Sequence, residues 1–466
     1  MEASYETREG YSLKHILVKN GRIVDPSQEL DTLSNLLITD GVVSKISSDI
    51  DSPDGAHVID AKGLVITPGF IDIHCHLRQP GFEDKETIAT GTEAAVRGGF
   101  TTVCAMPNTN PPTDTRATVD FINRVSLETG VAQVLPIGCI TKGSLGLELS
   151  EMGELAEAGV VGFSDDGHPV ANPNIMRQAL SYSLSHGLPI INHCESLSLS
   201  QGGVMNEGWI SNRLGLKGIP TSAEATMVSR DIALAKLTGG RLHIAHMSTE
   251  ESVEIIASAK SQGIRVTCEV TPHHLTLSDE SVLGRTGNIV PNKFDALTQT
   301  AYDTNAKVNP PLRTDDDVQA MVQALKNGIV DFIATDHAPH NEVGKLCTFD
   351  EADFGISGLE TAFGSVMSLA QSDKIGLSSI IEKLTIAPAK FLIESSKILD
   401  NKLGTLQVGA PGDVAVFDPD EKWIVDPNQF ASKGKNTPLD GSTLTGKIKL
   451  TIVRGTIQYS DLKNDD

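Results

Sequence analysis

Histidines and carboxylates recur in this sequence at the ends of short apolar runs, in a pattern suited to divalent metal ions. His74 ends the run GFIDIH, and His76 lies two residues further on. Side chains of an extended chain repeat every second residue, so both imidazoles can reach one ion. His193 in INHCE and His246 in IAHMST end two other runs, and Asp336 follows another in ATDHAPH. Each histidine alone is as readily structural as ligating, but four imidazoles facing a carboxylate suit zinc.

Other polar side chains end runs of the same kind. Asn108 follows one run, and the adjacent Asp165 and Asp166 end another in FSDDG. Because successive side chains of a strand point to opposite faces, only one of these two carboxylates can point inward. The residues alone leave that choice open. His273 and His274 more readily shape a strand end than bind metal, because the ligand set is filled without them.

Arg78 lies two residues beyond His76, so an extended chain would point it the same way as both histidines. The formal net charge of -22 would repel an anionic substrate, which would therefore need a local cation. A guanidinium can hold a carboxylate through two parallel hydrogen bonds. If the substrate is an anion, Arg78 is therefore the cation expected to bind it.

Eight apolar runs alternate with longer helix-like stretches, which predicts an α/β fold of the (β/α)8 TIM-barrel type. The runs are GFIDIH, FTTVCAMP, VAQVLPIGCI, GVVGFSDDG, LPIINHCE, RLHIAHMS, IRVTCEVTPHH and DFIATDHAPH. Their near-continuous apolar character is typical of buried parallel strands. A doubly wound sheet is the weaker alternative, because no G-x-G-x-x-G follows a first strand. In a barrel the carboxyl ends of all eight strands converge on one mouth, which would assemble the polar residues there.

Short alternating strands flank these runs on both sides. Asn20-Gly21 and Asp40-Gly41 predict hairpin turns near the N-terminus, and GDVAVFDP and KLTIVRGTIQY predict strands near the C-terminus. We expect the two ends to pair into one small composite β domain. The expected division is 1–66 and 399–466 for the β domain and 67–398 for the barrel. The long polar connection 275–308 is expected to cover the mouth as a lid.

Composition excludes several classes of protein. The chain of 466 residues has no long run of Lys and Arg, so nucleic acid is not expected as a partner. No apolar run approaches the length of a membrane span, and the N-terminus lacks the basic and apolar regions of a signal peptide. The six cysteines are dispersed without a C-x-x-C pair. We therefore expect a cytoplasmic protein with reduced thiols.

Together these residues resemble the amidohydrolase superfamily and, within it, the bacterial class I dihydroorotases. The resemblance spans nearly the whole chain and does not rest on any single motif. It is carried by GFIDIHCHLRQPG, AMPNTNPP, FSDDG, HCE, HMST, TPHHL, NPPLR and ATDHAPH. The segment 288–305 looks inserted relative to that family. The resemblance also implies that the flanking strands form the composite β domain that superfamily members attach to the barrel.

The resemblance implies one or two zinc ions per chain, with two favoured. His74, His76 and Asp336 would hold the first ion, and His193 and His246 would hold the second. Asp166 is the bridging ligand that the family alignment favours over Asp165. Many members of the superfamily bridge their metals with a carboxylated lysine instead, but FSDDG contains no lysine.

The implied reaction is reversible zinc-dependent hydrolysis of (S)-dihydroorotate to N-carbamoyl-L-aspartate, in de novo pyrimidine (UMP) biosynthesis. Asp336 would act as general acid and base. Asn108 and His340 would assist Arg78 with the substrate carboxylate, and Asn309 and the Phe354-Gly355 backbone would contact the ring. The implied substrate-binding residues are thus Arg78, Asn108, Asn309, His340, Phe354 and Gly355.

Two alternative functions stay open. A hydantoinase, dihydropyrimidinase or allantoinase would open similar cyclic amides, but those relatives typically carry the bridging lysine and their substrates lack a carboxylate for Arg78. A non-catalytic partner of aspartate transcarbamoylase is the second alternative, and it is disfavoured because every implied ligand position is filled. Association with that enzyme in addition to catalysis, and a homodimer, are both compatible with the resemblance.

Overall fold

The structure is a computed structural model that describes residues 13–284, 301–395, 399 and 401–462. The predicted lid lies partly outside this range, because 285–300 are not among the described residues. The same holds for most of the segment 288–305 that was expected to be an insertion. In the described part of the chain, none of the helices is both long and apolar enough for a membrane crossing.

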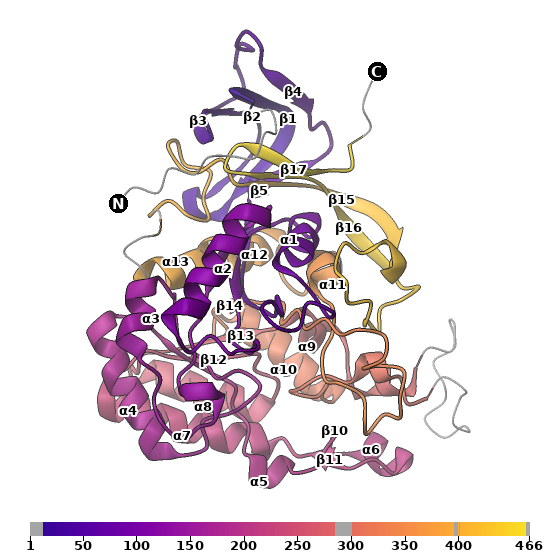
Figure 1. Cartoon of the computed structure of the whole chain (residues 1–466). Helices are drawn as coiled ribbons and strands as arrows, with labels where there is room; N and C mark the ends of the chain where they lie inside the picture. Colours follow the sequence, from indigo (N-terminus) through magenta and orange to yellow (C-terminus); the bar gives the residue numbers. More distant parts are fainter. Residues whose placement is uncertain (1–12, 285–300, 396–398, 400, 463–466) are drawn as a thin grey trace.

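The two ends of the chain meet in one eight-stranded sheet, which Figure 1 shows stacked on the rest of the molecule. The N-terminal strands are β1 (His15–Asp25), β2 (Leu30–Thr39), β3 (Val42–Ser47), β4 (His57–Asp60) and β5 (Val65–Pro68). The C-terminal strands are β15 (Val414–Ile424), β16 (Thr443–Val453) and β17 (Thr456–Ser460). The sheet order is β17-β16-β15-β5-β1-β2-β3, with β4 paired to β1. Antiparallel pairing of β15 with β5 joins the two ends, so the expected composite sheet is present, while the boundaries at 66 and 399 stay a prediction.

One of the two predicted hairpins of this sheet is wrong. Asp40-Gly41 forms the expected turn between β2 and β3. Asn20-Gly21 instead lies inside β1, where the register with β2 shifts between Val18 and Gly21. A Cβ at Gly21 would lie 2.4 Å from the Ile66 side chain, so glycine lets β1 pass close to β5. This glycine therefore serves a β-bulge and a close contact, two roles that glycine in a strand commonly has.

The eight predicted runs form a closed ring of parallel strands. The strands are β6 (Phe70–Cys75), β7 (Phe100–Ala105), β8 (Gln133–Pro136), β9 (Ile190–Asn192), β12 (Leu242–Ile244), β13 (Val266–Val270) and β14 (Phe332–Ile333). They pair as β6-β7-β8 and as β9-β12-β13-β14. The fourth run contributes Phe163, which bridges Gly138 and Ile190, and a bridge from Cys75 to His337 completes the ring. The predicted barrel is therefore confirmed.

Helices lie on the outside of this ring (Figure 1). They are α1 (Ile88–Arg97), α2 (Arg116–Thr129), α3 (Met152–Ala158), α4 (Pro173–Ser183), α7 (Ser222–Thr238), α8 (Glu250–Ser261), α10 (Asp315–Lys326), α11 (Leu359–Gln371), α12 (Leu377–Leu384) and α13 (Ile386–Ser395). Shorter elements are α5 (Leu197–Ser200), α6 (Trp209–Leu214), α9 (Pro272–Thr276), and the parallel pair β10 (Met205–Asn206) and β11 (Gly218–Ile219). Apolar side chains of the strands, such as Ile71, Ile191 and Phe332, cluster with Phe391 of α13. This packing fills the core below the strand ends that carry the polar residues.

Candidate metal centre

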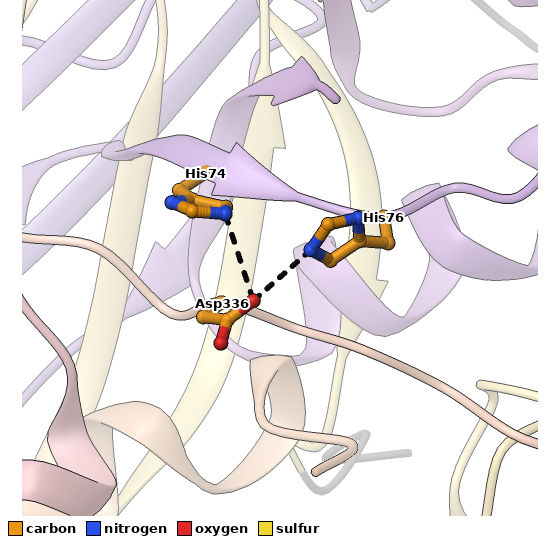
Figure 2. Close-up of side chains that lie close together, drawn as sticks. All are labelled: His74, His76 and Asp336. Atoms are coloured by element: carbon orange, nitrogen blue, oxygen red, sulfur yellow. Dashed lines mark hydrogen bonds and ion pairs between the residues drawn. The ribbon is translucent and has the colours of Figure 1, made fainter. Parts of the chain in front are cut away.

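The first group of metal-binding side chains comes from β6 and from the segment after β14. His74 is fully buried in β6, and His76 follows the last residue of that strand. The Nε2 atoms of His74 and His76 lie 3.6 and 3.0 Å from Oδ1 of Asp336. Figure 2 shows both imidazoles directed at this carboxylate. The three side chains form one of two groups in the described residues whose ligand atoms could hold an ion.

The second group is centred on Asp166. Its Oδ1 lies 3.6 Å from His74 Nε2, 3.3 Å from His246 Nε2 and 3.7 Å from His193 Nδ1. Its Oδ2 lies 3.5 Å from His76 Nε2. Asp166 thus lies among all four imidazoles, where a carboxylate could bridge two ions.

The neighbouring Asp165 is turned to other partners. Its Oδ1 accepts hydrogen bonds from the backbone N–H groups of Ile140 and Thr141, at 2.8 and 3.0 Å. Burial raises the pKa of Asp165 to about 6, although hydrogen bonds from Thr141 and Ile140 lower it in part. The strand-end geometry therefore directs Asp166, and not Asp165, at the histidines.

Three of the four imidazoles are oriented by a second contact. Nδ1 of His74 lies 2.5 Å from Oε1 of Glu269, and Nδ1 of His76 lies 2.8 Å from Oδ1 of Asn108. Nε2 of His193 lies 3.0 Å from Oε2 of Glu195. An acceptor on one ring nitrogen fixes the tautomer, so the other nitrogen presents its lone pair. Those other nitrogens are the ones that face Asp166 and Asp336.

Two buried atoms at the centre are unsatisfied. His74 Nε2 and Asp166 Oδ1 have no hydrogen-bond partner among the described residues. Buried polar atoms in folded proteins nearly always have a hydrogen-bond partner, so two unpartnered atoms that face one another need an explanation. A divalent cation would satisfy both atoms, and imidazole nitrogen with carboxylate oxygen is a donor set that zinc accepts. The residues present therefore fit a metal centre.

The electrostatics of the cluster keep its carboxylates ionised. Burial would raise the pKa of Asp166, but the charge of His74 and contact with His246 hold that pKa well below its ordinary value. Burial is likewise outweighed at Glu269, where the charge of His74 and hydrogen bonds from His243 and His74 lower the pKa to about 2. Anionic carboxylates in a buried site favour a cation between them.

The backbone bends sharply at this mouth. Arg78, His246 and Asp336 have positive φ angles of 61, 32 and 46°, a region that non-glycine residues seldom occupy. The chain was expected to stay extended from His76 to Arg78, and this is wrong, because β6 ends at Cys75 and Arg78 has a positive φ.

Arg78 nevertheless lies beside another predicted substrate-binding residue. Its Nη2 is 3.3 Å from Nε2 of His340, and its Nε donates to the Pro339 carbonyl at 3.3 Å. His340 also contacts Asp353, at 2.7 Å, and the Phe354 carbonyl, at 2.8 Å. The structure thus brings Arg78, His340 and Phe354 together at one side of the mouth.

The two predicted asparagines lie elsewhere in the site. Asn108 was expected beside Arg78, but its Oδ1 is engaged by the His76 imidazole. Asn309 donates from Nδ2 to Glu195 at 2.9 Å and lies 3.4 Å from His193 Nε2. Both asparagines therefore contact the histidine cluster.

Sequence reasoning missed Glu269 and Glu195, which orient His74 and His193. Glu269 is a fully buried carboxylate inside the strand VTCEV. A charged residue within an otherwise mostly apolar run was the sequence feature that could have indicated its role. Behind it, His243 Nε2 lies 3.2 Å from Glu269 Oε2. His274 contacts Thr271 and the Pro310 carbonyl, and within the part of the chain that the structure describes neither His273 nor His274 belongs to a group that could hold an ion.

Known proteins are similar to this chain in sequence and in fold. A dihydro-orotase-like family model matches residues 63–252. A dihydroorotase of Thermoanaerobacter sp. (strain X514) is 47% identical over 445 residues, which is 95% of this chain and 97% of that protein. A dihydroorotase of Pelotomaculum thermopropionicum is 48% identical over 447 residues, covering 96% of this chain and 99% of that protein.

Solved structures give a consistent result. An L-hydantoinase (dihydropyrimidinase) from Arthrobacter aurescens superposes with a TM-score of 0.80 at 26% identity, over 96% of each chain. A D-hydantoinase from Thermus sp., at 22% identity and a TM-score of 0.76 over 96% of this chain and 95% of the other, shares the fold. The barrel and the site at its mouth define an enzyme of the amidohydrolase superfamily. Within that superfamily, the chain belongs to the dihydroorotase family.

Proposed function

We propose that this chain is a dihydroorotase that interconverts (S)-dihydroorotate and N-carbamoyl-L-aspartate. Relatives named dihydroorotase match nearly its whole length at 47 to 48% identity. The observation that carries the proposal is the position of Arg78, whose guanidinium lies beside His340 at the edge of the carboxylate and imidazole cluster. Burial lowers the pKa of Arg78, while the charges of Asp336 and Asp166 oppose that shift, so the cation lies within the electrostatic reach of both carboxylates.

Two zinc ions fit the proposal. His74, His76 and Asp336 would hold one ion, His193 and His246 the other, and Asp166 would bridge them. A bound divalent ion lowers the pKa of water and polarises a carbonyl group. The orphaned atoms His74 Nε2 and Asp166 Oδ1 support this ligand set.

Asp336 is proposed to move the proton. Its Oδ1 is engaged with His76 and His74, which fixes the carboxylate and leaves Oδ2 to accept a proton from the attacking water. Burial would raise the pKa of Asp336, but the contact with His76 and the charge of His74 outweigh it and lower that pKa. The carboxylate is therefore ionised and can act as a base. It would then pass the proton to the departing ring nitrogen, and the reverse steps would close the ring.

The substrate carboxylate is proposed to pair with Arg78. A guanidinium can give two parallel hydrogen bonds to a carboxylate. His340, at 3.3 Å from Arg78, and the Phe354-Gly355 backbone would line the same side of the substrate. Asn309 would contact the ring from the side of His193.

We also propose a subtype, a cellular compartment and an assembly for this chain. The aspartate in FSDDG, where many superfamily members carry a lysine, supports the class I subtype. All six cysteines lie in described residues without a disulfide, and five are buried, which supports a reducing cytoplasmic location. A homodimer and association with aspartate transcarbamoylase are proposed from the resemblance.

A hydantoinase-like activity is the second candidate. It is favoured by the structural likeness to the L-hydantoinase of Arthrobacter aurescens, with a TM-score of 0.80. Substrates of that kind lack the carboxylate that Arg78 would hold. The two candidates therefore differ in the charge of the preferred substrate.

The substitution Asp336→Asn tests the mechanism. The native chain should contain zinc by elemental analysis and hydrolyse dihydroorotate, whereas the variant should lose about a thousandfold or more in kcat because the amide cannot act as base. Asp316→Asn, in the exposed first turn of α10, is the matched control and should keep native turnover. Native-like turnover in Asp336→Asn, or activity in a chain free of metal, would contradict the proposal.

A further inference from the structure

A segment of the C-terminal part of the chain reaches the mouth of the barrel. Residues 431–437, which we call the strap, lie between β15 and β16 in the sequence. A Cβ added at Gly434 would lie 2.4 Å from the Pro339 side chain and 2.5 Å from Ser357 Oγ. The strap therefore passes directly against the two loops that carry His340 and Gly355.

Asn436 is buried in the strap and joins these two loops. It is 4% exposed. Its Oδ1 accepts from the His340 backbone N–H and from Ser357 Oγ, both at 2.9 Å. Its Nδ2 donates to the carbonyls of Ala338 and Gly355, at 3.0 and 2.9 Å. Both donors and both acceptor positions of the amide are thus used, so asparagine is the side chain that satisfies all four contacts.

The strap is itself anchored to the barrel. The Glu360 carboxylate in the first turn of α11 accepts from the backbone N–H groups of Ala431 and Ser432, at 2.9 and 3.2 Å. Ser432 Oγ donates to Oε2 of Glu86 at 2.5 Å. The same Oε2 lies 3.3 Å from Nε2 of His337, the residue after Asp336. These contacts fix the strap, so Asn436 has a rigid base from which to hold the loops.

We infer that Asn436 is a positioning residue for substrate binding, an inference that rests on the proposed function. It sets the spacing between His340, beside Arg78, and the Gly355 backbone. It contacts neither the imidazoles nor the carboxylates of the metal centre. Loss of the Asn436 side chain should therefore weaken the binding of dihydroorotate and leave metal binding intact.

The test is Asn436→Ala, measured by steady-state kinetics on the zinc-loaded chain. The KM for dihydroorotate should rise about tenfold or more, because buried polar partners are left unpaired and the two loops separate. The kcat should stay within about threefold and the zinc content should equal that of the native chain. A merely structural role would lower the folded fraction, which reduces kcat and leaves KM unchanged.

Two further variants sharpen this test. Asn436→Asp keeps the acceptor Oδ1 and replaces the donor Nδ2 with a carboxylate oxygen facing the Ala338 and Gly355 carbonyls, so it should also raise KM. Asn35→Ala is the control, because Asn35 joins Asn20 and Ser48 in the β sheet through similar amide contacts. It should leave KM at the native value. A native KM in both Asn436 variants would overturn the inference.

A substrate-independent readout separates this inference from the proposed function. Hydrogen exchange at the backbone amide of His340 should be faster in Asn436→Ala than in the native chain, because that amide donates to the Oδ1 that the substitution removes. The Ser357 amide donates to the backbone carbonyl of Asn436, which the substitution keeps, so it is the reference amide. Unchanged exchange at His340 would overturn the positioning role. Faster exchange in a zinc-loaded chain that never hydrolyses dihydroorotate would support the positioning role and contradict the proposed function instead.

Discussion

At the scale of single residues, the orientation of His74, His76 and His193 depends on partners that do not face the metal centre. Glu269 illustrates this, because it contacts Nδ1 of His74 at 2.5 Å and Nε2 of His243 at 3.2 Å while fully buried. It also accepts from the backbone N–H of His246 at 3.2 Å. One carboxylate therefore links a histidine of the first metal group to the strand end of the second.

The substitution Glu269→Gln should weaken zinc binding about 10- to 100-fold, because the amide removes a charge and disrupts the orientation of His74. Zinc affinity can be measured by competition with a chelator of known affinity. Glu394→Gln is the control, since Glu394 is 70% exposed and pairs with Arg241 outside the site. An affinity within twofold of native would show that Glu269 has no part in metal binding.

The histidines could be predicted from sequence because each one ends an apolar run, and strand ends converge in a barrel. The choice between Asp165 and Asp166 could not be derived from strand alternation, which says only that the two side chains point to opposite faces. Glu269 was missed because its role depends on contact with His74, which is 195 positions away. Sequence indicates what a residue can do, whereas its partner is determined by the fold.

At the scale of elements, local patterns predicted strands well and turns less well. All eight apolar runs join the barrel, although the fourth contributes only the bridges of Phe163. The dipeptide Asn20-Gly21 was misread because a hairpin and a β-bulge both need residues that tolerate positive φ. The side chain of Ile66 occupies the space beside Gly21, which explains why a glycine is needed at this position.

Glu360 in α11 gives a prediction about pH. Burial raises its pKa from 4.5 to about 7, although hydrogen bonds from Ala431 and Ser432 lower it in part. Between these two values the folded chain keeps a proton that the unfolded chain has released. The contribution of Glu360 to stability is therefore present at low pH and falls as pH rises through this window.

The variant Glu360→Gln cannot titrate, so the free energy of unfolding should fall less between pH 5 and pH 7.5 than in the native chain. The difference should be about 1–3 kcal/mol, because most of the rise in pKa from 4.5 to about 7 lies inside this pH range. Urea unfolding at both pH values measures it, and Glu394→Gln should behave as the native chain does. Equal pH dependence in the native and Glu360→Gln chains would show that Glu360 is not the titrating group.

At the scale of the whole molecule, segments from the two ends of the chain share one sheet, and the C-terminal part also contributes to the mouth. Alternating strands at both ends predicted the shared sheet. The strap was not predicted, because Asn436 acts through contacts with loops 79 to 98 residues away in sequence. Such contacts leave no periodic signal in the sequence.

The net charge of -22 would repel the proposed substrate, which is an anion, so the chain needs a local cation to bind it. The most direct test compares kcat/KM of the zinc-loaded native chain for dihydroorotate and for dihydrouracil, which has the same ring without the carboxylate. If Arg78 pairs with that carboxylate, dihydroorotate should be favoured about a hundredfold or more. Equal or greater efficiency with dihydrouracil would contradict the assignment as a dihydroorotase.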